Sequence, residues 1–473
     1  METRHMNCES DTGRRRFFRR LALSSLVFSG VKGFPYRAEG AVSARHWDVV
    51  VIGGGPGGVP AAVAAARNGA RVLLVERYGF LGGMATAALV LPYMKYSAGG
   101  NIIVRGLFEE FLDLLEEQGG VKRFLPTEER MIRLNTFPTD LEDRAHFDDE
   151  SMKRVLDRFV LDAGVDLLLH ASAVGVLKDG DRIEAVRVFH KGGIEDLSAN
   201  VFVDSTGDGD IAAWGGANIE IGREQDQGCQ PMTTSFRMAN VAIDRIPDGK
   251  EINRLFDAAK KRGEIDNPRE NVLKFFTAHP DVMHFNSTRV IGKTALDGWS
   301  MTEAEIEGRR QVDELARFLT KRVAGFENAY LMKTGAQIGI RESRRVMGRY
   351  VLTADDVIEG RKFDDGIACG SYAIDIHNPS GTGTKMIYLD EGIYYHIPYR
   401  SLVPLGIGNL IVASRCISAT HEAHSSLRVM PTVWGIGHAG GIAAALSVKH
   451  DLPPEKVDPA ELRSLLKKQG AYL

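Results

Sequence analysis

Three glycines and a carboxylate form the clearest chemical pattern in the sequence. Gly53, Gly55 and Gly58 read G-x-G-x-x-G, and Glu76 follows at about the 20-residue spacing of dinucleotide-binding units. Glycine permits the tight turn, the approach of a pyrophosphate to the backbone and close helix–strand packing. A carboxylate after the second strand accepts hydrogen bonds from ribose hydroxyls. The pattern therefore predicts a dinucleotide site.

The elements around these residues have the order that such a site needs. A β-branched run at 48–52 predicts a buried strand, 61–67 a helix with small residues, and 71–75 a second strand ending at Glu76. The helix N-terminus would offer unpaired N–H groups to phosphate. Pro60 falls in the first helical turn, where its missing N–H has no partner to lose.

A second G-x-G-x-x-G occurs at Gly435, Gly437 and Gly440. No clear strand precedes it, and no strand ending in an acid follows. We interpret this segment, 433–448, as a helix that needs small residues for close packing, so the chain has one dinucleotide-binding unit.

Several later segments carry a family resemblance. They are Leu81–Thr86 (LGGMAT), Asp204–Asp210 (DSTGDGD), Arg341–Arg345 (RESRR), and the C-terminal segments IPYRSLVP, NLIVASRCISATHEAHSSLRVMPT and GIGHAGGIAAAL. Together they resemble bacterial FAD-dependent oxidoreductases of the glutathione-reductase-like superfamily, over nearly all of residues 46–450. One departure is Ser414, where that family pattern has glycine before Arg415.

The resemblance implies FAD as cofactor and an α/β fold: a Rossmann-like FAD-binding domain, with a parallel sheet and a β-meander, plus an inserted mixed α+β substrate domain. It also implies that the 433–448 helix points its N-terminus at the flavin. Asp208 and Asp210 could be N-caps of the next helix instead of cofactor-binding residues, and we favour the N-cap for Asp210. The cofactor-binding residues expected from the motif and the resemblance are Gly53, Gly55, Pro56, Gly57, Gly58, Glu76, Arg77, Gly82, Gly83, Met84, Ala85, Thr206, Gly207, Asp208, Arg415, Gly437 and Gly440.

The expected organisation has five parts. A signal peptide covers 1–44, the FAD-binding domain 45–218 and 401–450, the substrate domain 219–400, and a C-terminal tail helix 451–473. Turns at 179–180 and 192–193 punctuate a meander of short strands between 165 and 205. Residues 151–163 predict an amphipathic helix and 302–323 a charged, solvent-facing one. Segments 230–238, 392–400 and 409–413 read as strands.

Histidines and arginines are the candidates for catalysis. Removing a hydride from an alcohol or amine carbon generally needs a base, for which histidine is suited. His421, His424 and His396 are the candidate bases, and Arg428 could lie near the flavin or bind a substrate carboxylate. Each histidine could instead be a hydrogen-bonded structural residue, which is the interpretation we favour for any single one of them.

Other polar side chains have plainer interpretations. Arg341 and Arg344 could be ion-pair residues that hold the two parts together, Cys416 reads as a small buried residue, and His377 as a loop residue. With Cys8 in the signal, three cysteines without C-x-x-C spacing argue against a thiolate metal site, and no other metal is expected.

The N-terminus predicts export. Five arginines stand between 14 and 20, and Arg14-Arg15-Arg16-Phe17 resembles a twin-arginine motif. An apolar run at 21–31 is too short to cross a bilayer, and small residues at 41–44 provide a cleavage site. A basic amphipathic helix or arm is the alternative. The twin-arginine machinery carries folded proteins. We therefore expect the protein to be exported to the periplasm or beyond with FAD already bound.

Bulk properties narrow the function further. The formal net charge is −3 over 473 residues, which gives no indication of nucleic-acid binding. We expect an exported FAD-dependent dehydrogenase or oxidase for a small organic substrate, preferably a sugar or polyol. Its electron acceptor would be oxygen, a quinone or a redox protein. The alternatives are a periplasmic reductase fed by a redox partner and a non-catalytic flavin-binding protein.

Overall fold

The computed structural model describes residues 46–124 and 144–473. Within the unit Arg45–Leu473 the chain forms one compact body. The predicted signal peptide lies outside the described residues. In the described part no single helix is long and apolar enough to cross a membrane. One bent pair of helices, His421–Leu427 with Met430–His450, is long and apolar enough when the two are taken together, by length and composition only.

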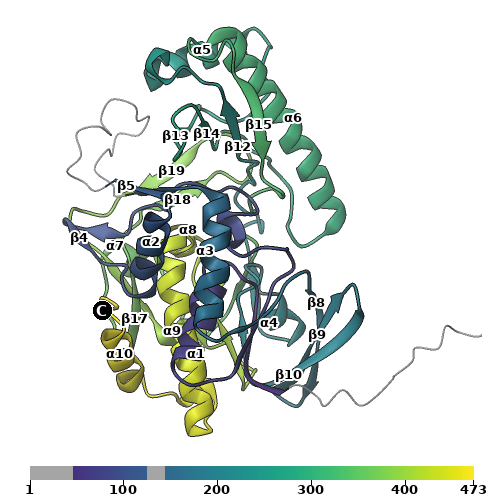
Figure 1. The fold of residues 1–473 in the computed structure, drawn as a ribbon, viewed down its shortest axis with the longest axis vertical. Coiled ribbons are helices and arrows are strands. Elements are labelled where there is room, and N and C mark those ends of the chain that lie inside the picture. Colours follow the sequence, from purple (N-terminus) through teal and green to yellow (C-terminus); the bar gives the residue numbers. More distant parts are fainter. Residues whose placement is uncertain (1–45, 125–143) are drawn as a thin grey trace, which may run out of the picture. The chain divides into compact units, whose positions relative to one another are not determined.

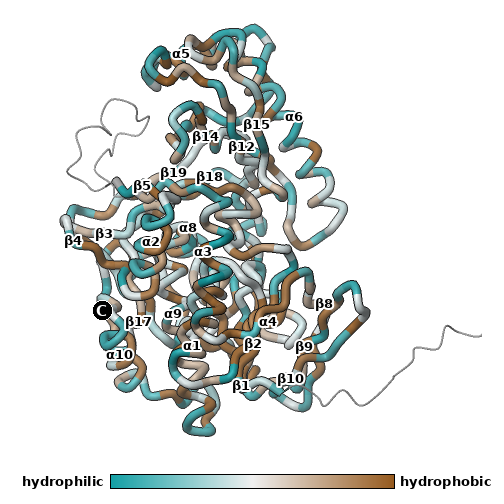
Figure 2. Tube along the Cα trace, viewed as in Figure 1, coloured by the Kyte–Doolittle hydropathy of each residue, from teal (hydrophilic) through white to brown (hydrophobic). Residues whose placement is uncertain are grey.

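A seven-stranded sheet carries the nucleotide-binding part of the fold (Figure 1). Strands β7 (Asp166–Leu168), β2 (Val72–Val75), β1 (His46–Ile52) and β10 (Gly193–Asp204) follow one another in parallel, and β21 (Leu410–Val412) pairs with the end of β10. Strands β1 and β2 are mostly buried, and Figure 2 shows both as hydrophobic. Both the parallel sheet and the strand predicted at 409–413 are confirmed.

The predicted meander is present at one side of this sheet. Strands β8 (Ser172–Asp179) and β9 (Arg182–His190) pair in antiparallel fashion, and β9 pairs with the first half of β10. The turns lie where glycine was expected, at 179–182 and 190–193. The second half of β10 leaves the meander and pairs with β1, so this strand joins both parts of the sheet.

Helices α1 (Gly58–Arg67) and α9 (Met430–His450) pack on this sheet. Their contact is close because a Cβ at Gly437 would collide with the carbonyl oxygen of Gly57, and one at Gly441 with that of Ala61. The interpretation of the second glycine motif as a packing helix is therefore confirmed. Trp434 of α9 stacks on Phe111 of α2 (Leu107–Glu117), with ring centroids 4.7 Å apart.

Two further helices close this part of the fold. Helix α3 (Asp149–Asp162) buries Met152, Val155, Leu156 and Phe159, the face predicted from the sequence. Asp148 caps it by accepting a hydrogen bond from Ser151 N–H over 2.8 Å. Helix α10 (Pro459–Lys468) provides the expected C-terminal helix and packs against α9.

A second hydrophobic core has residues from 236 to 329 only. It joins α5 (Gly249–Lys261) and α6 (Gly298–Arg322) to a sheet of order β13-β14-β12-β15, and these elements lie together in Figure 1. The strands are β13 (Lys274–Phe276), β14 (Met283–Phe285), β12 (Phe236–Ala239) and β15 (Tyr330–Thr334). Residues of 344–400 contribute instead to the larger hydrophobic core around the seven-stranded sheet. The part of the chain with a separate core is therefore shorter than the substrate domain predicted at 219–400.

Two details differ from expectation. Helix α6 is not wholly solvent-facing, because Val312, Leu315 and Leu319 recur on one face and enter the second core. The strand expected at 230–238 is confined to β12, and the residues before it make only the single bridges Met232–Val290 and Thr233–Gly339.

The remaining elements are short. They are β3 (Ser97–Ala98), β4 (Asn101–Ile102), β5 (Val121–Phe124), β6 (Arg144–Phe147), α4 (Asp210–Trp214), β11 (Ile219–Ile221), β16 (Arg344–Val346), α7 (Ala354–Ile358), β17 (Gly366–Gly370), β18 (Ile374–His377), β19 (Thr384–Ile387), β20 (Tyr395–Pro398) and α8 (His421–Leu427). Strand β20 lies inside the predicted 392–400 segment, and β18 pairs with β19.

Candidate active site

The glycine loop lies at the carboxyl end of β1, where parallel sheets bind ligands. Gly53 has φ +101°, which favours glycine, and its Cβ would collide with the Ser205 backbone. A Cβ at Gly58 would collide with the Gly53 carbonyl, whereas at Gly55 the nearest atom would be the Cα of Gly83, 3.6 Å away. Gly53 and Gly58 are thus needed for packing, and Gly55 leaves its backbone open on the cavity side.

Glu76 is held against this loop. One carboxylate oxygen accepts a hydrogen bond from Gly54 N–H over 2.7 Å, and the other accepts one from Tyr78 N–H over 2.8 Å. Burial raises the pKa of Glu76 above its ordinary value, against the effect of these two N–H donors. Each oxygen keeps a second lone pair, so the side chain can still accept from ligand hydroxyls.

The segment after β10 lies against the glycine loop. Asp204 accepts from Thr206 N–H and Oγ–H, and burial raises the pKa of Asp204 to about 6. Thr206 Oγ1 also accepts from Asp210 N–H at 3.0 Å. Asp210 is therefore not the N-cap of α4: the N-cap position is Gly209, and Asp210 pairs with Arg344 over 2.6 Å.

Asp208 anchors an arginine beside the loop. Its carboxylate accepts from Arg415 over 2.8 Å and from Ser343 over 2.6 Å, and the buried Nε of Arg415 has no partner among the described residues. Cys416 is buried next to it and donates to the Gly207 carbonyl over 2.7 Å, as a small core residue. Ser414 replaces the family glycine without closing the site, since it lines the cavity with Arg415.

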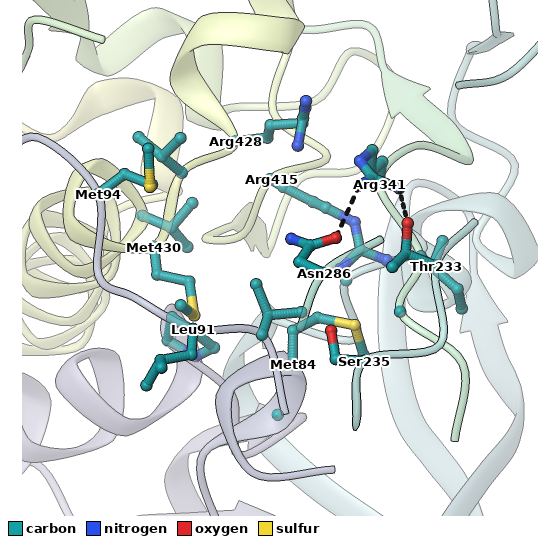
Figure 3. A pocket seen from close by; sticks show the side chains of 18 of the residues that line it. Met84, Leu91, Met94, Thr233, Ser235, Asn286, Arg341, Arg415, Arg428 and Met430 are labelled. Atoms are coloured by element: carbon teal, nitrogen blue, oxygen red, sulfur yellow. Dashed lines mark hydrogen bonds between the residues drawn. The ribbon is translucent and has the colours of Figure 1, made fainter. Parts of the chain in front are cut away.

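These segments open on a single cavity of about 440 Å³. Of the expected cofactor-binding residues, eleven line it: Gly53, Gly55, Pro56, Gly57, Glu76, Arg77, Gly83, Met84, Thr206, Gly207 and Arg415. The first residues of α9, Met430 and Val433, line it too, so this helix begins at the cavity as expected. Figure 3 shows Met430 with Leu91 and Met94 on one side, apart from Arg341.

Six expected residues lie outside the cavity lining. Gly437 and Gly440 are in the interior of α9, where they pack against α1 and against Ala413, so the helix reaches the site by its N-terminus and not by these glycines. Gly58 lies under the loop, and Asp208 acts through Arg415. The other two are Gly82 and Ala85.

None of the three histidines expected to act as bases lines the cavity. His421 Nδ1 lies 2.8 Å from the buried carboxylate of Glu342. His424 is fully buried, and burial lowers its pKa well below the ordinary value. His396, on β20, accepts from Phe363 N–H at 3.3 Å, and burial lowers its pKa to about 4. Helix α8 and strand β20 turn these side chains into the core. His421 and His396 have the hydrogen-bonding contacts of structural residues, whereas neither ring nitrogen of His424 has a partner among the described residues.

A different histidine reaches the cavity wall. His377, at the end of β18, lines the cavity with Asp375, and its Nε2 lies 3.5 Å from the Asp375 carboxylate. Its Nδ1 lies 3.3 Å from Arg269, 3.2 Å from Arg289 and 3.1 Å from Thr384 Oγ1. Because guanidinium only donates, Nδ1 is the unprotonated acceptor and Nε2 carries the proton.

His377 is therefore a positioning residue, since both ring nitrogens are engaged. Burial lowers its pKa to about 3, so it remains neutral among the arginines. The sequence interpretation as a loop residue missed it. The available signal was its alternation with Asp375 in the run Ile374–His377, which places both side chains on one face of a strand.

Arg428 and Arg341 complete this wall (Figure 3). Arg428 donates to Gln230 Oε1 and to the Asp375 carbonyl, each at 3.2 Å. Arg341 donates to the Pro231 carbonyl at 2.7 Å, to Thr233 and to Asn286. Arg428 lines the cavity, and its expected role near the flavin or a substrate carboxylate stays a prediction. Arg341 lies there too rather than in an ion pair between the two parts.

The site fits a dinucleotide with a flavin. The glycine loop leaves open backbone where a pyrophosphate needs it, Arg415 has an unused buried donor, and Glu76 has spare acceptor capacity. The N-terminus of α9 supplies a positive dipole end at the same cavity. All four features come from residues that the sequence associated with FAD.

Comparison with known proteins gives the family. A digeranylgeranylglycerophospholipid reductase from Thermoplasma acidophilum is 25% identical over 204 residues, which cover 42% of this chain and 48% of that protein. The match thus spans about half the length of such curated relatives.

Solved structures with a similar arrangement include a geranylgeranyl bacteriochlorophyll reductase-like protein from T. acidophilum (TM-score 0.46, 14% identity, covering 90% of this chain and 84% of that one). Another is the p-nitrophenol 4-monooxygenase of Pseudomonas putida (TM-score 0.48, 10% identity, covering 90% and 86%). The family model described as FAD dependent oxidoreductase matches residues 48–466. The chain therefore belongs to the FAD-dependent oxidoreductase family, with FAD as its cofactor.

Proposed function

We propose that this flavoenzyme oxidises a small hydroxylated organic substrate, which loses a hydride to FAD and its hydroxyl proton to solvent water. The observation that supports this is the composition of the cavity wall. Residues of the nucleotide-binding sheet line one part, and hydrogen-bonding side chains from the rest of the chain line another, among them Thr233, Ser235, Asn286 and Tyr372. Such groups bind hydroxyls with defined orientation, in agreement with the sugar or polyol expected from the sequence.

Bound FAD supplies the redox chemistry by accepting two electrons as a hydride. The protein residues hold and orient the substrate. Asn286 and Thr233 are themselves fixed by Arg341, so their hydrogen-bonding directions at the wall are set before a ligand arrives. The positive end of α9 at the cavity stabilises negative charge there.

Flavin bleaching tests the proposal. Purified protein is mixed anaerobically with sugars, polyols and their acid derivatives, and the absorbance of oxidised flavin is followed. Loss of that absorbance with a subset of donors is the expected result. Full retention with every hydroxylated donor would contradict it.

A reductase is the second candidate, favoured by the reductase named above among the relatives and by the apolar side of the cavity at Leu91, Met94 and Met430. Its test uses the same protein after chemical reduction of the flavin. Reoxidation by an added unsaturated compound without oxygen would favour the reductase over the oxidation that we propose.

We also propose export to the periplasm through the twin-arginine machinery, with FAD already bound. The support is the sequence of residues 14–44 alone. Electrons would then leave to oxygen, a quinone or a redox protein outside the cytoplasm. Fractionation of cells, with the flavin content measured in each fraction, tests this part separately from the chemistry.

A further inference from the structure

Four arginines gather on one wall of the cavity region, although they are far apart in the sequence. They are Arg269, Arg289, Arg341 and Arg428. The side chains of Arg269 and Arg289 are almost wholly buried, with 3% and 1% of the residue exposed. His377 Nδ1 lies between these two, so a neutral ring joins them without adding charge.

Two of the four have a carboxylate partner. Arg289 lies 3.1 Å from Glu270, and Arg428 lies 3.5 Å from Asp375. Among the described residues no carboxylate oxygen lies within 4 Å of the guanidinium nitrogens of Arg269 or Arg341. The wall therefore has two more positive charges than negative ones.

Arg269 and Arg341, the two without a carboxylate partner among the described residues, both border the cavity. Arg341 is the one labelled in Figure 3. Its Nη1 donates to a backbone carbonyl and to Thr233, and its contact with Asn286 is long, at 3.4 Å. Burial lowers its pKa well below the ordinary value, and the like charges of Arg428 and Arg269 act in the same direction, whereas the Asp375 carboxylate acts in the opposite one. A buried guanidinium in this environment is stabilised when an anion is present.

The pyrophosphate and the ribose of FAD have binding partners elsewhere in the site. The pyrophosphate has the glycine loop and Arg415, and the ribose has Glu76. The four arginines belong instead to segments 269–289, 341 and 428. Three of the four arginines, Arg269, Arg289 and Arg341, precede the last strand of the nucleotide-binding sheet. Their excess charge is thus not needed for the dinucleotide phosphates.

We infer that Arg341 and Arg428 bind a carboxylate of the substrate, so that the preferred substrate of the proposed oxidation is a small hydroxy acid and not a neutral polyol. This inference rests on the proposed function. Guanidinium binds carboxylate with paired N–H donors, and Arg269 and Arg289 add to the positive potential of this wall. Asp375 and His377 hold the arginines in place.

Matched ligand pairs test the inference. Gluconate is compared with glucitol, glycerate with glycerol, and lactate with propane-1,2-diol. Each pair differs at one end, which is a carboxylate or an uncharged carbon group. Binding is measured from the difference spectrum of the bound flavin and from the thermal midpoint of the holoenzyme, which require no turnover. Glycerol phosphate and inorganic sulfate are added as anions without a carboxylate.

Wild type should bind at least one acid at least tenfold more tightly than its neutral partner and than sulfate or glycerol phosphate. Arg341→Met should lose most of that preference while its flavin-to-protein ratio stays at the wild-type value, and Arg341→Lys should keep part of it. Arg245→Met is the matched control, because Arg245 pairs with Glu327 at the surface and should leave all affinities unchanged.

Three outcomes would overturn the inference. They are equal affinity for acid and neutral partners, tighter binding of phosphate than of any carboxylate, and loss of FAD from both Arg341 variants, which would make this arginine a cofactor ligand. The proposed oxidation fails separately. If acids bind through Arg341 but do not bleach the flavin, the carboxylate site is supported and the proposed oxidation is wrong.

Discussion

Glu76 and Gly54 are joined by a 2.7 Å hydrogen bond from the glycine N–H to the carboxylate. The bond ties the end of β2 to the loop after β1, so the group that would hold ribose also fixes the loop that would hold pyrophosphate. Loop and carboxylate should consequently respond together to mutation.

Replacing Glu76 with alanine should weaken FAD binding by on the order of 1–3 kcal/mol, since it leaves the Gly54 and Tyr78 N–H groups and the ribose hydroxyls without an acceptor. Fluorescence titration of apoprotein with FAD measures the loss. Glu76→Gln, which keeps one acceptor oxygen, should lie between wild type and Glu76→Ala. Wild-type affinity in the alanine variant would remove Glu76 from the site.

Gly437→Ala should destabilise the protein by about 1–3 kcal/mol, because the added methyl group meets the Gly57 carbonyl and has no space. FAD affinity should fall with it, as Gly57 belongs to the nucleotide loop. Gly298→Ala is the control: a Cβ there meets no atom within 4 Å. Urea denaturation of both variants gives the comparison, and equal midpoints would contradict the close contact of α9 with α1.

Acid should destabilise the protein partly through His438. Burial lowers the pKa of His438 to about 4, although Gln469, 2.8 Å away, acts in the opposite direction. The unfolded chain takes up this proton near pH 6.5 and the folded chain only near pH 4. Stability is therefore lost as the pH falls through this window, by up to about 1.4 kcal/mol per pH unit.

In His438→Gln that contribution should disappear. Unfolding free energies at several pH values between 5 and 7 would show a shallower slope than in wild type, whatever the variant's absolute stability. An unchanged slope would mean that His438 titrates alike in the folded and unfolded chains.

Export should depend on the guanidinium groups of Arg14 and Arg15, and not only on their positive charge. With both replaced by lysine, the protein should fold, bind FAD and stay in the cytoplasm at full length, because lysine lacks the planar fork. Wild type should lose about its first 44 residues and reach the periplasm with flavin. Fractionation with N-terminal sequencing distinguishes the two, and equal export of both would reduce the arginines to a general positive charge.

The nucleotide-binding half of the site could be predicted from sequence because its determinants are local. Gly53, Gly58 and Glu76 act within one β–α–β unit, and the close packing at Gly437 follows from the small residues around it. The β-meander and α3 were equally predictable, since turn glycines and a 3.6-residue period report directly on local structure.

The substrate half could not be predicted in the same way. Arg269, Arg341 and His377 meet only after three separate segments have packed, and no local period marks that meeting. His421 and His424 were favoured because they stand close in sequence to the flavin-facing helix. The direction of α8 then decides their position: it carries both into the core, with His421 beside Glu342. Proximity along the chain thus gave no information about which face of the helix borders the cavity.

The contact of Gly437 and Gly441 with the backbone of α1 also has a consequence for the order of events during synthesis. The glycine loop leaves the ribosome long before the helix that supports it, because α1 begins at Gly58 and α9 at Met430. The loop therefore lacks its support until α9 has been synthesised and has packed against α1. A route that moved the nascent chain across a membrane would deliver the loop before that helix, and a fragment ending before Met430 would keep the loop without the helix.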